Sequence, residues 1–206
     1  APRRLRRRAD RGRPARRPCL AAAPAERPPC VLYAADRGPA RTDAKQRPLA
    51  GPPRAVLVQS PDRPNWQPLL DSGRLTKADT FSEVCEYALG QQVAIRVIAN
   101  PSYRDTVTRR RMSLSSVAEC GSWLRRRLAD HGVDVALNHI EVGERVRMTG
   151  VKGEDHPITV ICRMFQARGT VQSPEAFHQA LAQGLGPGKA YGCGLLITKP
   201  LTDEAW

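Results

Sequence analysis

Two spacings of apolar residues predict the strands and helices of the second half of the chain. The run VAIRVIA predicts a strand over residues 93–98, and apolar side chains alternate along the segment PITVICRMFQARGTV as in a half-buried strand. The segment SLSSVAECGSWLRRRLADHG instead has helical spacing, with Ser115 or Ser116 as the N-cap. The alternating strand residues are Ile158, Val160, Cys162 and Met164, and the predicted helix face is Val117, Cys120, Trp123, Leu124 and Leu128.

A second helix is predicted over SPEAFHQALAQGLG, with Ser173 as N-cap and Pro174 at its first position. Between the helices, VDVALNHIEV and ERVRMTG are predicted to be extended, and CGLLITKPL closes the pattern as a strand. From residue 93 onward the order is β-α-β-β-α-β, the ferredoxin-like unit of the α+β class. Its two helices cover one face of an antiparallel sheet, which leaves the other face free for a ligand or a partner.

The first half of the chain has weaker signals. Short β-rich runs occur at 30–35 and 54–60, and a Pro-rich turn follows the second run. The segment TFSEVCEYAL has a plausible helical face, although it lies next to a clear strand. Residues 1–29 contain two large aliphatic residues and no aromatic one, which predicts disorder. They are either a basic arm that grips phosphate or an unselected, misread segment, and we favour the second interpretation.

Charge is concentrated at the start of the chain. Of the formal net charge of +13 over 206 residues, +10 falls within the first 50, which hold 14 Lys/Arg and 4 Asp/Glu. A polyanionic partner for the folded part must therefore be argued from local clusters of charge. No apolar run approaches the ~20 residues of a membrane span, and no export signal is recognisable, so we expect a cytoplasmic protein without a membrane partner.

The six cysteines are scattered without a CxxC pair or a nearby histidine at ligand spacing. We expect free thiols, no disulfide, no metal and no cofactor. The four histidines are expected to be surface or packing residues: His131 at a helix end, His139 in a strand, His156 in a loop and His178 within the second helix. Of the tryptophans, Trp66 and Trp123 are expected in the core.

The stretch GLGPGKAYGCGLL places five glycines and one lysine between the second helix and the closing strand. Glycine permits positive φ and close backbone approach, so exposed N–H groups here could cradle a phosphate beside the charge of Lys189. A plain glycine-rich helix end and turn explains the composition equally well. The spacing fits neither a P-loop nor a dinucleotide fingerprint. The five residues are Gly184, Gly186, Gly188, Gly192 and Gly194.

This stretch, extended to GLGPGKAYGCGLLITKPL, closely resembles the end of the CasE family, the CRISPR RNA-processing endoribonucleases of the type I-E Cascade complex. Upstream, VLVQS followed by Pro and Trp, IRVIANP before a basic loop, and WLRRRLADHG occur in the family's order, so the resemblance covers residues 54–206. It implies two ferredoxin-like domains in tandem. We therefore expect a remnant of the first domain at 30–92, with FSEVCEYAL as a strand, and an RNA-binding domain at 93–206.

The resemblance implies binding of the CRISPR repeat hairpin and metal-independent cleavage of precursor CRISPR RNA, in which a 2′-hydroxyl attacks the adjacent phosphate and a histidine assists proton transfer. The family's catalytic histidine precedes the strand that CVLYA would match, whereas the first histidine here is His131. No catalytic residue is therefore assigned. We interpret residues 1–29 as a wrong-frame or misassigned start, because Arg/Pro/Ala-rich text is what GC-rich DNA yields in the wrong frame.

Three clusters are predicted to contact RNA. Relatives also carry a basic loop before the first helix, and the hairpin ERVRMTGVKGEDHP matches a family element that reaches the RNA groove. Arg125, Arg126 and Arg127 fan around a helix axis, which favours a solvated face. Tyr191 could stack on a base or anchor its turn. The predicted RNA-binding residues are Arg109, Arg110, Arg111, Arg145, Arg147, Lys152, Gly184, Gly186, Gly188, Lys189, Tyr191, Gly192 and Gly194.

Two other function classes remain open. A non-catalytic subunit could hold guide RNA within the Cascade complex beside the other Cascade subunits. A ferredoxin-like regulatory module for a small molecule would also fit the fold, but it would not need clustered arginines.

Overall fold

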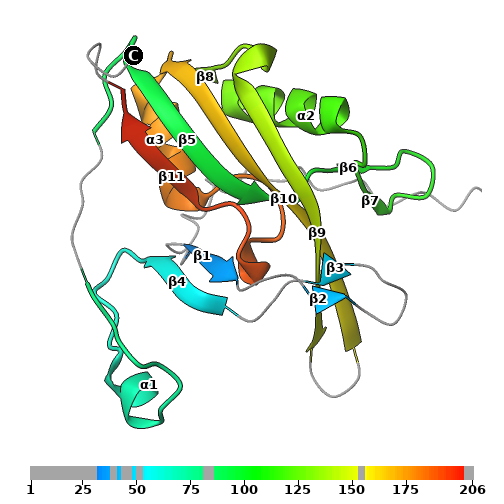
Figure 1. The fold of residues 1–206 in the computed structure, drawn as a ribbon. Coiled ribbons are helices and arrows are strands. Elements are labelled where there is room, and N and C mark those ends of the chain that lie inside the picture. The colour runs from blue at the N-terminus through cyan, green and yellow to red at the C-terminus, as the bar shows by residue number, and fades with distance from the viewer. Residues whose placement is uncertain are drawn as a thin grey trace, which may run out of the picture.

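A seven-stranded sheet backed by two helices organises the chain in a computed structural model that describes residues 32–37, 41–42, 48–49, 53–80, 86–152 and 156–201. The strand order is β11-β5-β10-β9-β3-β2, and β8 pairs with β10 at one end. All pairs are antiparallel except β3 with β9. Figure 1 shows α2 and α3 on the same face of this sheet. The class is therefore a mixed α and β fold with an antiparallel sheet.

The elements of the first part of the chain are β1 Leu32–Arg37, β2 Arg41–Thr42, β3 Pro48–Leu49, β4 Pro53–Gln59 and α1 Gln67–Asp71. The central elements are β5 Gln92–Ala99, β6 Ser102–Arg104, β7 Arg111–Ser113, α2 Val117–Asp130, β8 Val133–Asp134 and the 3-10 turn η1 Leu137–His139. The last are β9 Ile140–Lys152, β10 His156–Val171, α3 Pro174–Gln183, the 3-10 turn η2 Lys189–Tyr191 and β11 Leu196–Pro200.

Helix α2 begins where the sequence predicts. Ser116 and Glu119 form a reciprocal capping box: the Ser116 hydroxyl accepts the Glu119 amide at 3.1 Å, and the Glu119 carboxylate accepts the Ser116 amide at 3.4 Å. Cys120, Trp123, Leu124 and Leu128 are buried as predicted. Val117 is 57% exposed, so its assignment to the buried face is wrong: it is the first residue of α2, and burial on this helix face begins at Cys120.

The N-cap of α3 is also as predicted, since the Ser173 side chain accepts the Ala176 amide and Pro174 opens the helix. Phe177 and Ala180 are the buried residues of α3. They pack with the α2 face and with the inward residues of β5 and β10 in one core. That core is the main source of stability, because burying large apolar side chains is worth about 1.5–3 kcal/mol each.

Strand β10 buries residues on both of its faces. Phe165, Ala167 and Val171 enter the core beneath the helices. Val160 and Cys162 point to the opposite face and pack with Cys193. The prediction that this second face is free is therefore wrong at one end of the sheet, where a loop covers it. Met164 is half-buried on this second face, and the Arg96 Nε group lies 3.2 Å from its sulfur.

The glycine loop, residues 184–194, is the segment that covers this end. The Gly194 amide donates to the Ile98 carbonyl at 2.7 Å, and the Leu185 amide donates to the Gly194 carbonyl at 2.8 Å. A Cβ on Gly186 would lie 3.0 Å from the Trp123 ring, and one on Gly194 would lie 2.6 Å from the Leu185 carbonyl oxygen. All five glycines of the loop have φ between 71° and 96°. The fold itself therefore requires glycine here.

Arg163 is a charged side chain that the core encloses, only 8% exposed within β10. Its Nη1 group donates to the Gly143 carbonyl at 2.7 Å, and its Nη2 group donates to the Ser115 carbonyl at 3.0 Å. Gly143 lies in β9 where the register against β10 shifts, and Ser115 precedes α2. One guanidinium thus joins the two central strands to the start of the first helix.

The first part of the chain departs most from expectation. β1 and β4 pair as two strands, as predicted for 30–35 and 54–60, but β2 and β3 extend the main sheet through the Leu49–Arg147 pair. The helix α1 was not predicted, and Trp66 at its start is half-buried, not in the core. Half of TFSEVCEYAL, residues 81–85, lies outside the described residues; its described part, Thr80 and 86–89, is neither helix nor strand. The segment 1–29 also lies outside the described residues.

Two histidine placements were wrong. His139 lies in the 3-10 turn η1, not in a strand, and His156 opens β10 opposite Lys152, not in a loop. His131, the C-cap of α2, and His178, within α3, lie where predicted.

Gly194→Ala should destabilise the protein by at least about 1–3 kcal/mol, because the new methyl group meets the Leu185 carbonyl at a positive φ. Gly150→Ala is the matched control: it lies in β9 with nothing within 4 Å of the added Cβ, and it should be neutral or stabilise by roughly 0.5 kcal/mol. Urea unfolding monitored by circular dichroism measures both. Equal midpoints for the two variants would contradict the assigned role of Gly194.

Arg163→Met should lower the free energy of unfolding by about 1–3 kcal/mol, because two backbone carbonyls lose their charged donor. Arg126→Met removes the same charge from an exposed position on α2 and should change stability by no more than about 0.5 kcal/mol. The same unfolding assay applies. A destabilisation of equal size in both variants would show that net charge, not the pair of hydrogen bonds, is responsible.

Candidate nucleic-acid interface

The predicted basic loop after β5 is a small two-stranded hairpin, β6 with β7. Its strands β6 and β7 pair Ser102 with Ser113, Tyr103 with Met112 and Arg104 with Arg111. At the turn, the Asp105 carboxylate accepts the Thr108 amide at 2.6 Å, the Thr108 hydroxyl at 2.7 Å and the Val107 amide at 3.2 Å. These bonds, those from Thr108 first, lower the pKa of Asp105. The only acid of the hairpin is thus committed to holding its turn.

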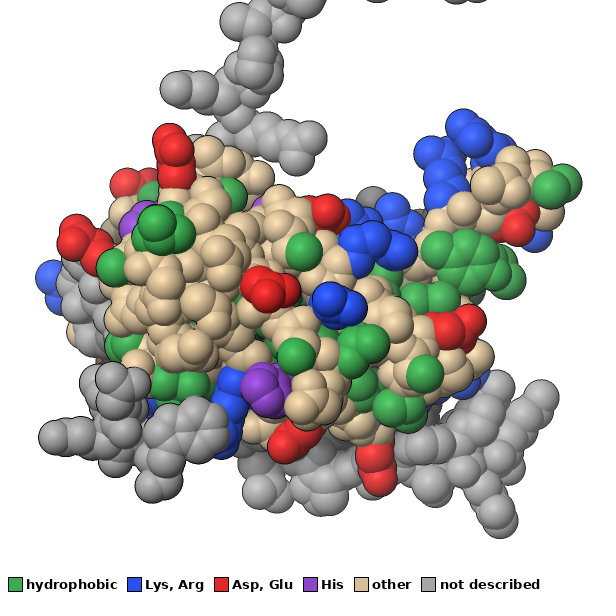
Figure 2. All heavy atoms as spheres, turned by 90° about the horizontal axis from the view of Figure 1, so that it is seen from above, with side chains coloured by type: hydrophobic (Ala, Val, Ile, Leu, Met, Phe, Trp, Pro, Cys, Tyr) green, Lys and Arg blue, Asp and Glu red, His purple; other side chains and the backbone are tan. Residues whose placement is uncertain are grey.

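The hairpin presents four arginines to solvent. Arg104 Nε donates to the Arg109 carbonyl at 2.9 Å across the turn, and Arg109 adopts a positive φ of 58°. The side chains of Arg104, Arg109, Arg110 and Arg111 are all exposed. Figure 2 shows Lys and Arg side chains gathered on this projection, with hydrophobic side chains beside them. A rigid turn that displays four guanidinium groups suits contact with phosphate.

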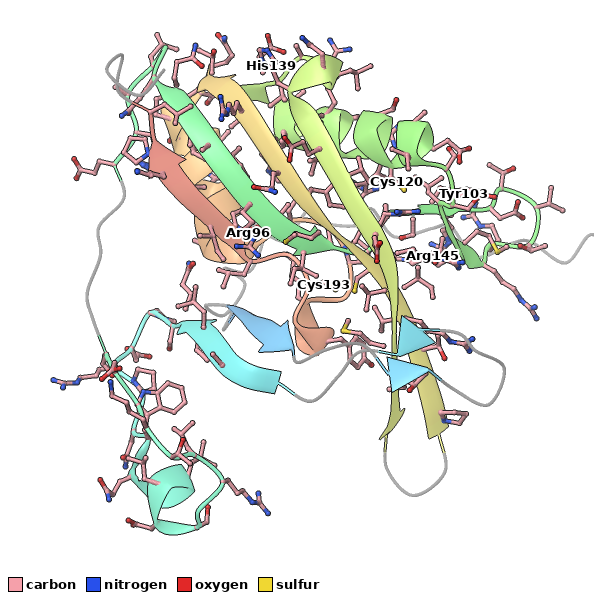
Figure 3. The ribbon with its side chains drawn as sticks, in the orientation of Figure 1. Arg96, Tyr103, Cys120, His139, Arg145 and Cys193 are labelled. Atoms are coloured by element: carbon pink, nitrogen blue, oxygen red, sulfur yellow. The ribbon has the colours of Figure 1, made fainter. Side chains whose placement is uncertain are left out.

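Arg145 lies close to the base of this hairpin. Arg145 pairs across the strands with Arg163, whose Nη2 group donates to the carbonyl of Ser115, just after the hairpin. The two ends of the hairpin are joined at its base, where the Leu114 amide donates to the Pro101 carbonyl at 3.0 Å. Burial raises the pKa of the Cys120 thiol, and the positive charges of Arg163 and Arg145 partly offset that rise. Figure 3 shows Arg145, Cys120 and Tyr103 toward the same side of the molecule. We call this region, the β6–β7 hairpin with Arg145, the basic end.

The other two predicted residues of β9 lie further along the strand. Arg147 is half-buried, pairs with Ile161 of β10 and has a buried Nε without a hydrogen-bond partner among the described residues. Lys152 is the last residue of β9, opposite His156. Arg145 is therefore the exposed guanidinium of β9 that the structure brings nearest to the hairpin.

The glycine loop uses most of its N–H groups internally. The amides of residues 184, 185 and 191–194 donate to backbone carbonyls. Within the described loop, this leaves the amides of Gly186, Gly188 and Lys189 as candidates for a phosphate. A Cβ on Gly188 would lie 3.6 Å from the Cβ of Asn100, the residue that follows β5 and precedes the hairpin. The loop and the hairpin therefore meet the same end of β5.

The charge of Lys189 acts on His131, the C-cap of α2. Burial lowers the pKa of His131, Asp130 opposes this effect, and the charges of Arg127 and Lys189 lower the pKa further. Arg127 itself lies over the Trp123 ring at 6.0 Å from its centroid. Arg125 and Arg126 are exposed on the helix surface. Tyr191 is 37% exposed at the end of η2.

The open face of the sheet carries a second, separate set of cations. The strand registers place Arg96, Arg168 and Lys199 on the face opposite the helices, and all three are exposed. Figure 3 shows Arg96 on the middle of this face, away from Tyr103. Sequence reasoning did not select these residues, nor Arg163 and Arg104. A charged residue inside the apolar run ICRMF was the signal that could have identified Arg163.

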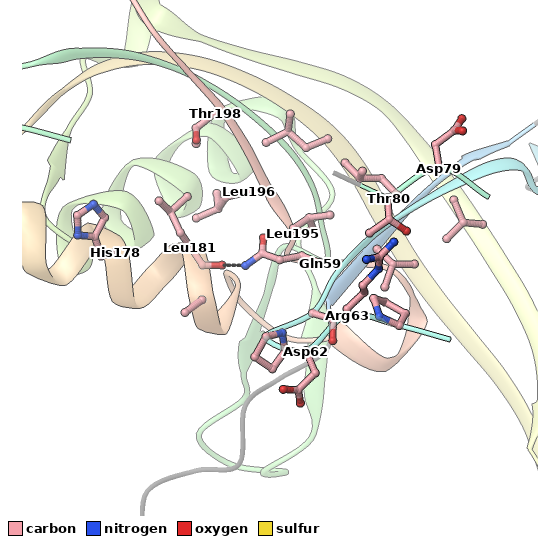
Figure 4. Close-up of a pocket in the computed structure, with 18 of the residues that line it drawn as sticks. Gln59, Asp62, Arg63, Asp79, Thr80, His178, Leu181, Leu195, Leu196 and Thr198 are labelled. Carbon is pink, nitrogen blue, oxygen red and sulfur yellow. Dashed lines mark hydrogen bonds between the residues drawn. The ribbon is translucent and has the colours of Figure 1, made fainter. Parts of the chain in front are cut away.

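A hollow lies between β4, α3 and β11 (Figure 4), lined by residues that include Gln59, Asp62, His178 and Thr198. The Gln59 amide donates to the Leu181 carbonyl at 3.0 Å across it. His178 is already engaged, since its Nε2 accepts the Tyr87 amide at 3.3 Å. Figure 3 places His139 at the far end of the sheet from Arg145. The structure thus gathers cations at the basic end without bringing His139 or His178 to them.

The described residues hold neither a metal-binding cluster nor a membrane-spanning helix. No three of their His, Cys, Asp or Glu side chains gather in a way that could hold a metal ion. Of the helices described, none is long and apolar enough to cross a membrane. Cys120, Cys162 and Cys193 are buried and take part in no disulfide, and the remaining three cysteines lie outside the described ranges.

Comparison with known proteins agrees with the geometry. A family model described as CRISPR associated protein matches residues 21–200. The chain is 31% identical over 159 residues, 72% of this chain and 74% of that protein, to the CRISPR-associated endoribonuclease Cse3 of Thermus thermophilus. It is 27% identical over 157 residues, 71% of this chain and 74% of the relative, to the CRISPR system Cascade subunit CasE of Escherichia coli.

A structure of Thermus thermophilus Cse3 bound to an RNA representing a pre-cleavage complex superposes with a TM-score of 0.63 at 28% identity, covering 83% of this chain and 78% of the other. The match to the family model extends over most of the residues that form the sheet, the hairpin and the glycine loop. The chain therefore belongs to the family of CRISPR associated proteins that includes Cse3 and CasE.

Proposed function

We propose that this chain binds the repeat hairpin of precursor CRISPR RNA and acts as a Cascade subunit in CRISPR RNA processing. The observation that carries the proposal is the basic end: four exposed arginines on a hairpin held by Asp105, with exposed Arg145 beside its base. The RNA-bound relative with the same fold supports it. A-form RNA is recognised mainly through its shape and phosphates, which suits guanidinium groups on a projecting hairpin.

The chain's architecture in this proposal is two ferredoxin-like domains, a remnant at 30–92 and an RNA-binding domain at 93–206. The sheet order β11-β5-β10-β9, with α2 and α3 on one face, supports the second domain. In this arrangement Arg109, Arg111 and Arg145 contact the phosphates of the stem, and Arg110 contacts an RNA phosphate next to the stem. Lys189 and the free amides of the glycine loop bind a further phosphate near the end of β5, and Arg147 and Lys152 extend the contact along β9.

The proposed reaction is transesterification. The 2′-oxygen of one nucleotide attacks the adjacent phosphorus, the bond from phosphorus to the 5′-oxygen breaks, and the products carry a 2′,3′-cyclic phosphate and a 5′-hydroxyl. A proton leaves the 2′-hydroxyl and another is delivered to the 5′-oxygen. The arginines of the basic end neutralise charge on the phosphorane-like transition state. The chain's described histidines have no assigned part in these proton transfers.

A non-catalytic guide-RNA-binding subunit is the second candidate. It is favoured by the placement of the histidines whose side chains are described: His139 lies at the far end of the sheet, His178 accepts a backbone amide, and His131 caps α2. This second candidate predicts that the chain binds the repeat hairpin but does not cleave it.

Incubation with a labelled repeat hairpin in EDTA separates the two candidates. The enzyme yields a 2′,3′-cyclic phosphate end, and a substrate with 2′-deoxyribose at the cleaved position stays intact. The binder gives a mobility shift without cleavage of either RNA. Affinity should fall steeply with salt, by at least about tenfold between 50 and 200 mM, because several phosphate contacts release counterions. Failure to bind the hairpin at 50 mM salt would contradict both candidates.

Asp105→Ala should weaken binding of the repeat hairpin by roughly fivefold. The turn loses the acceptor that orders its arginines, and ordering them during binding costs about 1 kcal/mol of binding free energy. Asp105→Asn keeps a side-chain oxygen and should retain most of the affinity. Asp134→Ala removes the same charge from an exposed position on β8 and should leave binding unchanged or slightly stronger. If Asp105→Ala instead binds RNA more tightly, net charge alone governs the interaction and the ordered turn is irrelevant.

A further inference from the structure

The β6–β7 hairpin carries an apolar pair as well as its arginines. Tyr103 and Met112 are directly opposite each other, so their side chains lie on the same face of the hairpin. Tyr103 is 48% exposed and Met112 is 46% exposed. Val107 at the turn is 87% exposed. An aromatic ring backed by a thioether, held on a two-stranded ribbon, forms a small apolar platform that the core does not cover.

The surroundings of this platform are cationic. Alternation along the strands places Arg110 on the same face as Tyr103 and Met112, and places Arg104 and Arg111 on the opposite face. Asp105, the only acid in the hairpin, is held by its own turn through Thr108. A ligand for the platform therefore has a flat apolar part for the ring and a negative group for Arg110.

An unpaired nucleotide has both features. Its base offers a π face to Tyr103, and its phosphate lies within the reach of a flexible guanidinium beside that ring. Bases inside the stem are excluded, because they are stacked on one another and their faces are not accessible. A protein partner fits less well, since one aromatic and one methionine amid four arginines supply much less than the area of about 800 Å² per partner that stable interfaces bury.

We propose that Tyr103, backed by Met112, is a stacking site for an unpaired nucleotide that flanks the repeat hairpin, and that Arg110 binds the adjacent phosphate. This inference rests on the proposed function, because the stem must dock at the basic end for its flank to reach the hairpin. The basic end recognises the stem through its shape and phosphates, and the platform adds a contact with a single-stranded nucleotide. It gives the protein a means to distinguish a stem embedded in a longer transcript from a stem with no flank.

The test compares three RNAs: the blunt repeat hairpin, the hairpin with an unpaired 5′ flank and the hairpin with an unpaired 3′ flank. Each flank carries one 2-aminopurine, whose fluorescence is quenched by stacking on an aromatic ring. Tyr103→Leu keeps an apolar contact with Met112 but lacks the ring, and Tyr103→Phe restores the ring. Leu137→Ala is the matched control, because Leu137 is also 48% exposed but lies in η1.

For one flanked RNA, Tyr103→Leu should bind roughly 5- to 100-fold more weakly and lose the 2-aminopurine quench, as expected for loss of one base stack. Tyr103→Phe and Leu137→Ala should match the parent protein, and all four proteins should bind the blunt hairpin equally. Equal affinity and quench for Tyr103→Leu and the parent on both flanked RNAs would overturn the inference. So would a variant that binds every RNA normally but no longer co-purifies with the other Cascade subunits, because the platform would then be a protein contact.

Failure of the proposed function gives a different pattern. If the parent protein does not bind the blunt hairpin, the repeat-hairpin function fails, and the Tyr103 site is tested on an unpaired oligouridylate carrying 2-aminopurine. On that probe, a quench that Tyr103→Leu removes supports the stacking site, and the absence of any quench overturns it.

Discussion

The buried guanidinium of Arg163 fixes the geometry of the basic end. A charge enclosed by a core is costly unless hydrogen bonds satisfy it, and here the acceptors are the carbonyls of Gly143 and Ser115. Gly143 sits where β9 changes register against β10, which sets the side on which Arg145 emerges. Ser115 links the hairpin to α2. The positions of the hairpin arginines and of Arg145 therefore depend on one internal side chain, Arg163.

The glycine loop imposes a second constraint at the same end of the sheet. Its backbone is bonded to Ile98 and folded against Trp123, and its glycines are required by positive φ and by close approach. The loop covers Cys162 and Val160 on the face that the helices leave bare. Its glycine content is therefore explained by packing first, and only a few of its amides are available to a ligand. A phosphate that binds the loop would therefore contact a backbone conformation that packing already requires.

The sequence predicted the long elements well because their signals are local. The capping residues and apolar spacing of α2, the N-cap of α3 and the alternation of β5 do not depend on distant contacts. The hairpin at Arg109 was missed as structure because its strands are three residues long and its order comes from Asp105. Exposure of Val117 and the turn at His139 depend on where α2 lies against the sheet. The candidate arginines could be found as clusters, but their grouping with Arg145 depends on Arg163, a contact between distant segments.

We propose that RNA binds at the basic end and not on the open face of the sheet. Hydrogen exchange of backbone amides, followed by mass spectrometry with and without the repeat hairpin RNA, tests it directly. We expect RNA-dependent protection of residues 103–112 and of the amides of Gly186, Gly188 and Lys189. Protection confined to the strands that carry Arg96, Arg168 and Lys199 would contradict binding at the basic end, because the RNA would then lie on the open face of the sheet.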